Sequence, residues 1–199
     1  MSTLKEDEAR MSRQGNPLLF FVLLIGGLLQ AAAQNAGVDA GVLAKANGGD
    51  AAAQVQAGES CAAQHDYVQA AAWYKKAAEQ NSIAGELHLA ALYRDGGDKA
   101  FPRDVEQAAS WYRKAAEQGD ATAQGTLGTL YTLGQGVTRS DVEAYYWLDL
   151  AASVKGPNQA QYAANRQIVG TRITADELAD VEDRVAKWKA AHPRPDSMQ

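Results

Sequence analysis

The segment AAAWYKKAAEQN at residues 70–81 decides the fold, because it recurs almost unchanged as AASWYRKAAEQG at residues 108–119. A third and looser copy, AYYWLDLAA, covers residues 144–152. The tryptophans of the three copies are separated by 38 and then by 36 residues. Self-similarity at a period of this length is typical of repeat proteins, in which each unit packs only against its neighbours.

The segments between these copies also match. LAALY at residues 89–93 corresponds to LGTLY at residues 127–131, and two extra residues near 97–100 explain the longer first period. Apolar residues fall at i, i+3 and i+4 in both kinds of segment, so each unit is predicted to contain two helices. Asn81 and Gly119 suit the left-handed end of the second helix, and this tight junction makes neighbouring helices antiparallel. The tryptophan of the second copy is expected to be buried between two helix pairs. The positions expected to pack the repeats together are Trp73, Tyr74, Leu89, Tyr93, Trp111, Tyr112, Leu127, Gly128, Tyr131 and Trp147.

The alternation of WYKKAAE and WYRKAAE with ATAQGTLGTLYTLGQGV at residues 121–137 resembles the Sel-like repeat (Sel-one type), a branch of the tetratricopeptide superfamily. The resemblance covers roughly residues 66–153. It departs from the family pattern in GDKA at residues 97–100, in place of a compact glycine loop, and at Ser140, where the family usually has aspartate. The resemblance implies an all-α, right-handed solenoid of about four antiparallel helix pairs, with adaptor or scaffold roles.

The repeat domain is predicted to extend over residues 50–191. Two further helices are expected to close the stack, and a TADE capping box opens the last of them, which runs through Trp188. Residues 34–49, rich in alanine, glycine and asparagine, are predicted to form a flexible linker. Two prolines indicate a loose tail at residues 192–199.

The N-terminus has the three-part pattern of a secretory signal peptide at residues 1–33. An apolar run, LLFFVLLIGGLL, covers residues 18–29 and follows the basic Arg13. The small residues after it fit the pocket of a signal peptidase, so cleavage is predicted between Ala33 and Gln34. The mature protein is therefore expected in the periplasm of a bacterium, or secreted.

Met11 is a second candidate for the true start, because residues 1–10 are more acidic than such signals usually are. The alternative to cleavage is a retained membrane anchor, but the apolar run is shorter than the roughly 20 residues that span a bilayer core. No cysteine follows the run, so there is no thiol to carry a lipid. We expect no stable membrane insertion of the mature chain.

Composition and spacing argue against several kinds of chemistry. The formal net charge is -5, and no run of five basic residues occurs, so nucleic acid is not an expected partner. Cys61 is the single cysteine, which excludes an intramolecular disulfide. The histidines are far apart and lack metal-ligand spacing; they are His65, His88 and His192. The lone GQG at residues 134–136 is interpreted as a turn. No cofactor, metal or catalytic residue is predicted, and a hydrolase is the weakest alternative.

The partner site is expected on the first helix of each pair, which faces the inside of the solenoid. Positions that do not pack inward are free to meet a protein or peptide partner, although ordinary solvent exposure is the simpler interpretation of each. The candidates are His88, Ala91, Arg94, Thr126, Thr129 and Thr132. A permanent structural subunit of a cell-envelope assembly is the alternative function.

Overall fold

The computed structural model describes residues 37–193. The chain divides into two units, Met1–Val38 and Asp39–Gln199, and the fold concerns the second. The predicted signal peptide, its cleavage site at Ala33 and Gln34, and the last six residues of the predicted tail lie outside the described residues. Within the described part of the chain all regular structure is helical. The helices are α3 Ala40–Asn47, α4 Ala51–Ala63, α5 Tyr67–Ala78, α6 Ile83–Asp95, α7 Val105–Glu117, α8 Ala121–Leu133, α9 Asp141–Ala152, α10 Gln159–Gly170 and α11 Ala175–Ala191.

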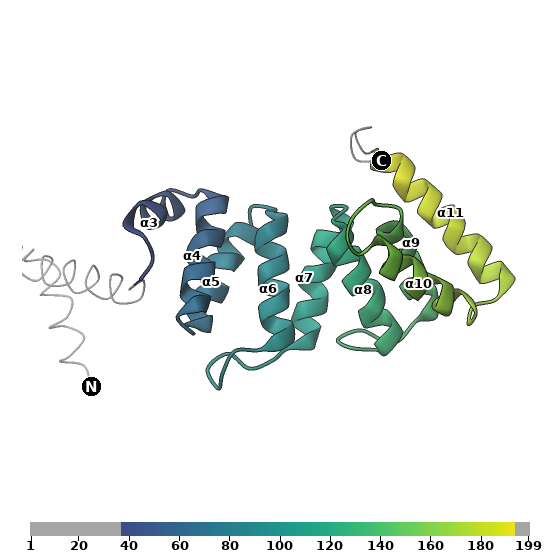
Figure 1. The fold of residues 1–199 in the computed structure, drawn as a ribbon, viewed down its shortest axis with the longest axis horizontal. Helices are drawn as coiled ribbons and strands as arrows, with labels where there is room; N and C mark the ends of the chain where they lie inside the picture. Colours follow the sequence, from purple (N-terminus) through teal and green to yellow (C-terminus); the bar gives the residue numbers. More distant parts are fainter. Residues whose placement is uncertain (1–36, 194–199) are drawn as a thin grey trace, which may run out of the picture. The chain divides into compact units, whose positions relative to one another are not determined.

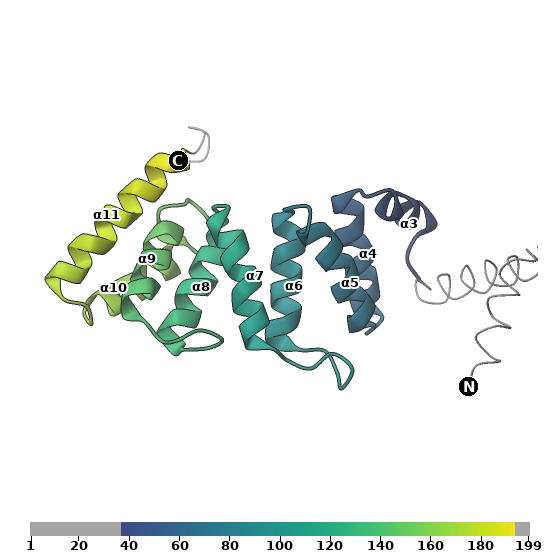
Figure 2. The same cartoon turned by 180° about the vertical axis from the view of Figure 1, so that it is seen from behind.

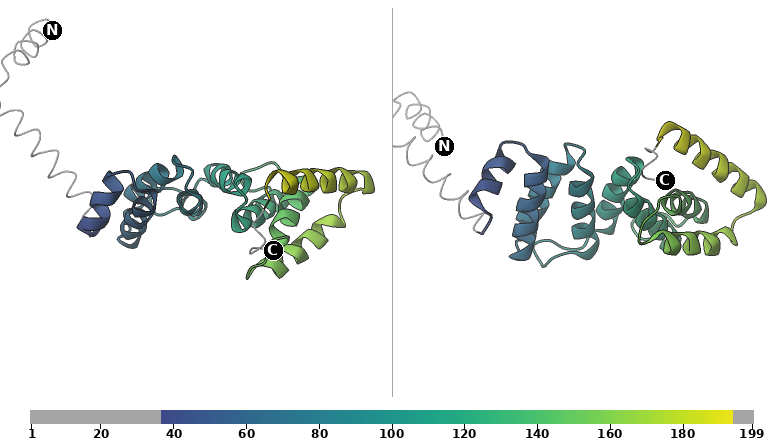
Figure 3. Two further views of the ribbon diagram at one scale, coloured as in Figure 1. Left: turned by 90° about the horizontal axis from the view of Figure 1, so that it is seen from above. Right: turned by 45° about the horizontal axis from the view of Figure 1, so that its top comes forward.

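The helices form consecutive pairs that stack side by side in chain order (Figures 1 and 2). Within the pairs α4 packs on α5, α6 on α7 and α8 on α9, and between pairs α5 packs on α6 and α7 on α8. This arrangement confirms the predicted all-α solenoid of antiparallel helix pairs. The last pair differs, because α10 and α11 each pack on α9 (Figure 3). No helix in residues 37–193 combines the length and the apolar character that crossing a membrane requires.

Short polar side chains begin the helices. Asp120 accepts a hydrogen bond from the Ala123 amide at 2.7 Å, and Ser140 accepts one from the Glu143 amide at 3.2 Å. Ser140 therefore caps α9 as Asp104 caps α7, and the departure from the family pattern leaves the helix start intact. The predicted left-handed junction is also confirmed, because φ is 59° at Asn81.

The GDKA departure lengthens the loop between α6 and α7, which extends beyond the helix ends (Figure 1). The loop closes on itself through backbone hydrogen bonds. The Gly97 amide donates to the Phe101 carbonyl at 2.9 Å, and the Asp104 amide donates to the Tyr93 carbonyl at 2.8 Å. The inserted residues thus change the loop without changing the register of the helices.

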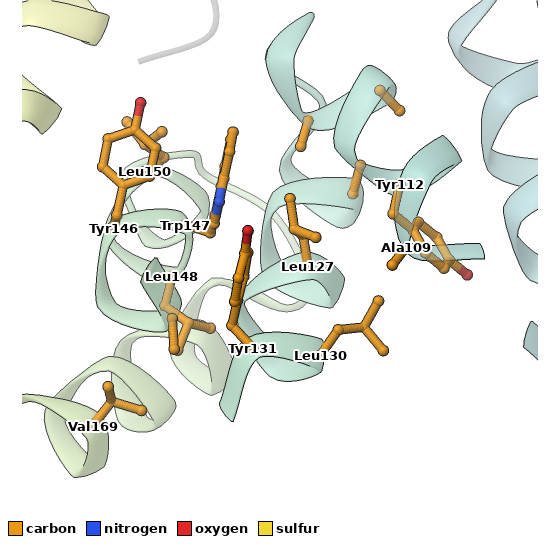
Figure 4. Packing of buried hydrophobic residues seen from close by; sticks show 14 of the residues in the cluster. Ala109, Tyr112, Leu127, Leu130, Tyr131, Tyr146, Trp147, Leu148, Leu150 and Val169 are labelled. Atoms are coloured by element: carbon orange, nitrogen blue, oxygen red, sulfur yellow. The ribbon is translucent and has the colours of Figure 1, made fainter. Parts of the chain in front are cut away.

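Glycines in the first helices let the second helices approach closely. A β-carbon added at Gly58 would overlap the ring of Tyr74, and one at Gly128 would come 2.7 Å from Leu148 Cγ. Figure 4 shows Leu127 and Leu148 in the packed layer between α8 and α9. The small residue and the large one are complementary, so the pair packs without a gap.

The three repeat tryptophans are not equally buried. Trp73 is 4% exposed and Trp147 is 6% exposed. Trp111 is only half-buried, which corrects the expectation that it lies buried between two helix pairs. The Lys114 ammonium group lies 3.8 Å from the centre of its ring, as the Lys76 ammonium group lies 3.9 Å from the centre of the Trp73 ring. Tyr93 is also half-buried, whereas the other eight predicted packing positions are buried.

Helix α3 replaces part of the predicted flexible linker at residues 34–49. Asp39 caps it by accepting hydrogen bonds from two backbone amides, and the helix packs on α4. Ala46 is 1% exposed, and its carbonyl accepts a hydrogen bond from Gln54 Nε2 at 3.1 Å. The alanine-rich composition indicated flexibility, but contact with α4 stabilises the helix.

A buried polar side chain occupies the fourth position of each repeat's first helix: Gln54, Glu86 and Gln124. The amide of Gln54 bonds to the end of α3, and Gln124 Nε2 donates to the Ala116 carbonyl of α7 at 3.1 Å. Each glutamine therefore links its helix to the end of the preceding one. A second link occurs in the first repeat, where Gln80 Nε2 donates to Gln54 Oε1 at 2.8 Å.

Glu86 breaks this pattern because an ionised carboxylate has no proton to donate. Its Oε2 accepts a hydrogen bond from Gln118 Nε2 at 2.7 Å. Burial raises the pKa of the Glu86 carboxyl, and the negative charge of Glu117 raises it further. The Lys114 charge and the Gln118 hydrogen bond lower this pKa and so oppose the rise. The side chain is 1% exposed, so the second repeat carries an ionisable group where the other two carry an amide.

Candidate functional site

The six predicted partner-binding residues lie on the first helices, and all are half-buried. His88, Ala91 and Arg94 belong to α6, and Thr126, Thr129 and Thr132 belong to α8. The two groups of three occupy equivalent positions in consecutive repeats. The structure gives them different neighbours.

The charged candidates on α6 are engaged within the protein. His88 Nε2 lies 3.3 Å from Glu59 Oε1 of α4, and its ring stacks on Tyr74 with 5.0 Å between the ring centres. Arg94 donates to the Asp95 carboxylate, and its Nη1 donates to the Tyr112 hydroxyl at 3.0 Å. Burial raises the pKa of Tyr112, and the Arg94 charge opposes that rise. These side chains contribute mainly to packing between helices.

Two of the candidates on α8 line a surface depression between α8 and α10, with a volume of about 160 Å³. We call it the α8–α10 depression, and its lining consists of Thr129, Thr132, Leu133, Asn165, Ile168 and Val169. Thr126, Ala91, His88 and Arg94 are not part of the lining. The structure thus separates the predicted set and adds four residues that the sequence did not indicate.

The lining carries no charged side chain, and most of its exposed surface is apolar. Thr129 Oγ1 donates to the Gly125 carbonyl at 3.0 Å, and Thr132 Oγ1 donates to the Gly128 carbonyl at 2.9 Å. Because both hydroxyl protons are used within α8, the threonines have no proton left to donate to a ligand. Leu133 completes the α8 side.

Exposed apolar area is concentrated in the depression. In residues 37–193 three large hydrophobic side chains are more than half exposed, and two of them, Leu133 at 58% and Ile168 at 55%, line the depression. The third, Val68, lies on α5. A local gathering of exposed apolar side chains is typical of an interaction site.

A glycine and a group of ion pairs fix the walls of the depression. A β-carbon at Gly125 of α8 would overlap the Tyr162 ring, so the glycine is what lets α10 lie on α8. Asp149 of α9 binds Arg166 of α10 and, at 3.2 Å, Lys189 of α11. The exposed leucine and isoleucine therefore project from a rigid framework.

Residues 37–193 contain no cluster of three or more histidine, cysteine, aspartate or glutamate side chains that could hold a metal ion. Cys61 is buried, and burial raises the pKa of its thiol, with Asp66 adding to the rise. A thiol with a raised pKa is a poor nucleophile at neutral pH.

Comparison with known proteins assigns the repeats. Residues 52–82, 83–120 and 121–153 each match the Sel1 repeat, and together these matches cover about half of the chain. They correspond to the pairs α4–α5, α6–α7 and α8–α9, so α10 and α11 lie outside the matched units. No curated protein matches the chain.

Two solved structures are similar. One is a protective antigen present in uropathogenic Escherichia coli strains that displays an SLR fold, with 31% identity and a TM-score of 0.65 over 75% of this chain. The chain spans about a third of the length of that antigen, since the match covers 32% of it. The other is a Sel1 repeat protein from Oxalobacter formigenes, with 26% identity and a TM-score of 0.54 over 63% of this chain and 94% of that protein.

Proposed function

Because the chain belongs to the Sel1 repeat family, we propose that it is an exported protein–protein interaction scaffold that binds a segment of a protein partner at the α8–α10 depression. Sel1 repeats generally mediate protein interactions. The observation that carries the proposal is the pairing of Leu133 and Ile168, both more than half exposed, from two different helices in one depression.

The depression favours binding because covering apolar surface releases it from water. Each square ångström of apolar surface that a partner covers contributes about 25 cal/mol. An uncharged lining adds little cost of desolvation, since no ionised side chain has to lose its water. The expected occupant is therefore an aliphatic side chain of a protein segment.

Capture of partners from an extract of the source cell tests the site. Leu133→Glu and Ile168→Glu each place a charge in the depression and are expected to abolish retention of the partner. Val68→Glu is the matched control, because Val68 is 52% exposed and lies on α5, outside the depression. A partner retained equally by all three variants would place the interaction elsewhere on the chain.

Export is proposed from the apolar run at residues 18–29 and the small residues that follow it. The mature protein is expected to begin at Gln34 and to be released with the periplasmic fraction. N-terminal sequencing of the protein recovered from cell fractions measures this directly. An intact N-terminus in the membrane fraction would replace the cleaved signal with an anchor.

A further inference from the structure

Two arginines adjoin the α8–α10 depression. Arg139 lies against Gly134, the residue after Leu133, because a β-carbon added at Gly134 would come 3.2 Å from the β-carbon of Arg139. The backbone amide of Arg172 donates to the Val169 carbonyl at 2.9 Å. Leu133 and Val169 both line the depression, so the backbone of each arginine lies close to a lining residue.

Both guanidinium groups bind the same carboxylate. Arg139 Nη2 is 3.5 Å from Asp141 Oδ2, and Arg172 Nη1 is 3.3 Å from Asp141 Oδ1. The arginine side chains are 60% and 39% exposed, whereas that of Asp141 is 21% exposed. Asp141 is also the first residue of α9, where the positive end of the helix dipole stabilises its charge. Two guanidinium groups share one carboxylate, so the cluster of Arg139, Arg172 and Asp141 has a net positive charge.

We propose that the α8–α10 depression selects a segment of a protein partner in which an acidic side chain lies close to an aliphatic one. This inference rests on the proposed function and adds the chemistry of the partner. The aliphatic side chain contacts Leu133 and Ile168, and the carboxylate pairs with Arg139 and Arg172. A guanidinium group suits this role because its planar fork of donors matches a carboxylate.

Charge complementarity supports this choice of partner. The chain has a formal net charge of -5, so its overall charge disfavours an acidic segment. A basic spot beside exposed apolar side chains gives such a segment one favourable place to bind. The charge then contributes mainly specificity, and the apolar contact contributes most of the affinity.

Two capped peptides test the inference on protein purified from cells that express the whole chain. They are acetyl-Gly-Leu-Ser-Glu-Gly-amide and the same peptide with glutamine in place of glutamate. Nuclear magnetic resonance titration is expected to shift the amide signals of Leu133 and Ile168. The glutamate peptide should bind about two- to fivefold more tightly at low salt, as for an exposed ion pair. The difference should vanish near 1 M salt, where charges are strongly screened.

Variants separate the local charge from the charge of the whole protein. The double variant Arg139→Gln, Arg172→Gln should bind both peptides equally. The control Lys45→Gln, Lys99→Gln makes the same change in net charge on α3 and on the loop between α6 and α7, and should keep the preference. Asp141→Asn frees both arginines and should increase the preference for glutamate, which gives a result even if the double arginine variant unfolds.

The possible outcomes distinguish the two proposals. Equal binding of both peptides with shifts at Leu133 and Ile168 would overturn the acidic preference and leave the apolar docking site intact. Absence of any shift at these two residues would contradict the docking site as well. A preference for glutamate that survives the double arginine variant would assign the charge effect to other residues and overturn the inference.

Discussion

Replacing Glu86 by glutamine is expected to stabilise the protein, because it restores to the second repeat the amide that the other two repeats carry. In the first repeat the equivalent Gln54 both donates to the Ala46 carbonyl and accepts from Gln80. Glu86→Gln can make the same two contacts, donating to the Ala78 carbonyl at the end of α5 and accepting from Gln118.

The magnitude follows from three contributions. A new hydrogen bond to Ala78 adds about 1 kcal/mol. Removing a carboxylate from a site where it is 1% exposed adds about 1–3 kcal/mol. Weakening of the Gln118 bond, whose acceptor becomes neutral, and loss of the Lys114 attraction together cost about 1 kcal/mol. The free energy of unfolding should therefore rise by about 1–3 kcal/mol at pH 7.

The effect depends on pH with a definite sign. Burial raises the pKa of Glu86 in the folded chain above its value in the unfolded chain, so the folded state holds the proton more tightly. The wild type therefore loses stability as the pH rises through the folded-state pKa, and Glu86→Gln does not. The difference between the two proteins should be small in acid and grow as the pH rises.

Urea unfolding followed by tryptophan fluorescence at several pH values measures the difference. Gln124→Glu is the converse control, because it places a carboxylate against the Ala116 carbonyl and should destabilise the protein at pH 7 by a similar amount. A Glu86→Gln variant that is no more stable than the wild type at pH 7, or whose advantage does not grow with pH, would refute the reasoning.

Four further substitutions have expected costs. Trp73→Ala should lower the free energy of unfolding by about 3–5 kcal/mol, and Trp111→Ala should lower it by less, because Trp111 is more exposed than Trp73; equal losses in urea unfolding would contradict this. Asp149→Ala should cost about 1 kcal/mol, and less at high salt, because it releases ion pairs with α10 and α11. Gly125→Ala should cost about 1–3 kcal/mol by overlapping Tyr162, and faster amide exchange in α10 would show it.

The helix pairs of the repeat could be predicted from the sequence because they depend on local interactions. The period of the two matching segments, the caps and the left-handed junction at Asn81 all depend on residues close in the chain. Ser140 departs from the family pattern, yet it caps α9 because its hydroxyl oxygen can accept the same hydrogen bond as a carboxylate. The predicted helix pairs and most of their packing residues followed from such local rules.

The candidate site is formed by α8, which belongs to a repeat, and by α10, which does not. Thr129 and Thr132 were predicted from their positions on a first helix, but Asn165 and Ile168 belong to α10, which lies outside the repeated units. Nothing in the order of residues indicates that α10 lies on Gly125 of α8. The sequence signal that could have indicated the depression was Leu133, an apolar residue outside the predicted packing positions of α8.

By itself, the sequence determined the repeat, its helix ends and the residues that pack one helix on the next, because these depend on periodicity and on capping between near neighbours. Only the tertiary structure showed at which positions periodicity and capping fail to predict the fold or the burial. Contact with α4 turns part of a predicted linker into α3, and Trp111 is half-buried where the equivalent Trp73 is buried. The approach of α10 to α8 leaves Leu133 and Ile168 exposed side by side, because burial is a property of the assembled neighbours and not of the residue.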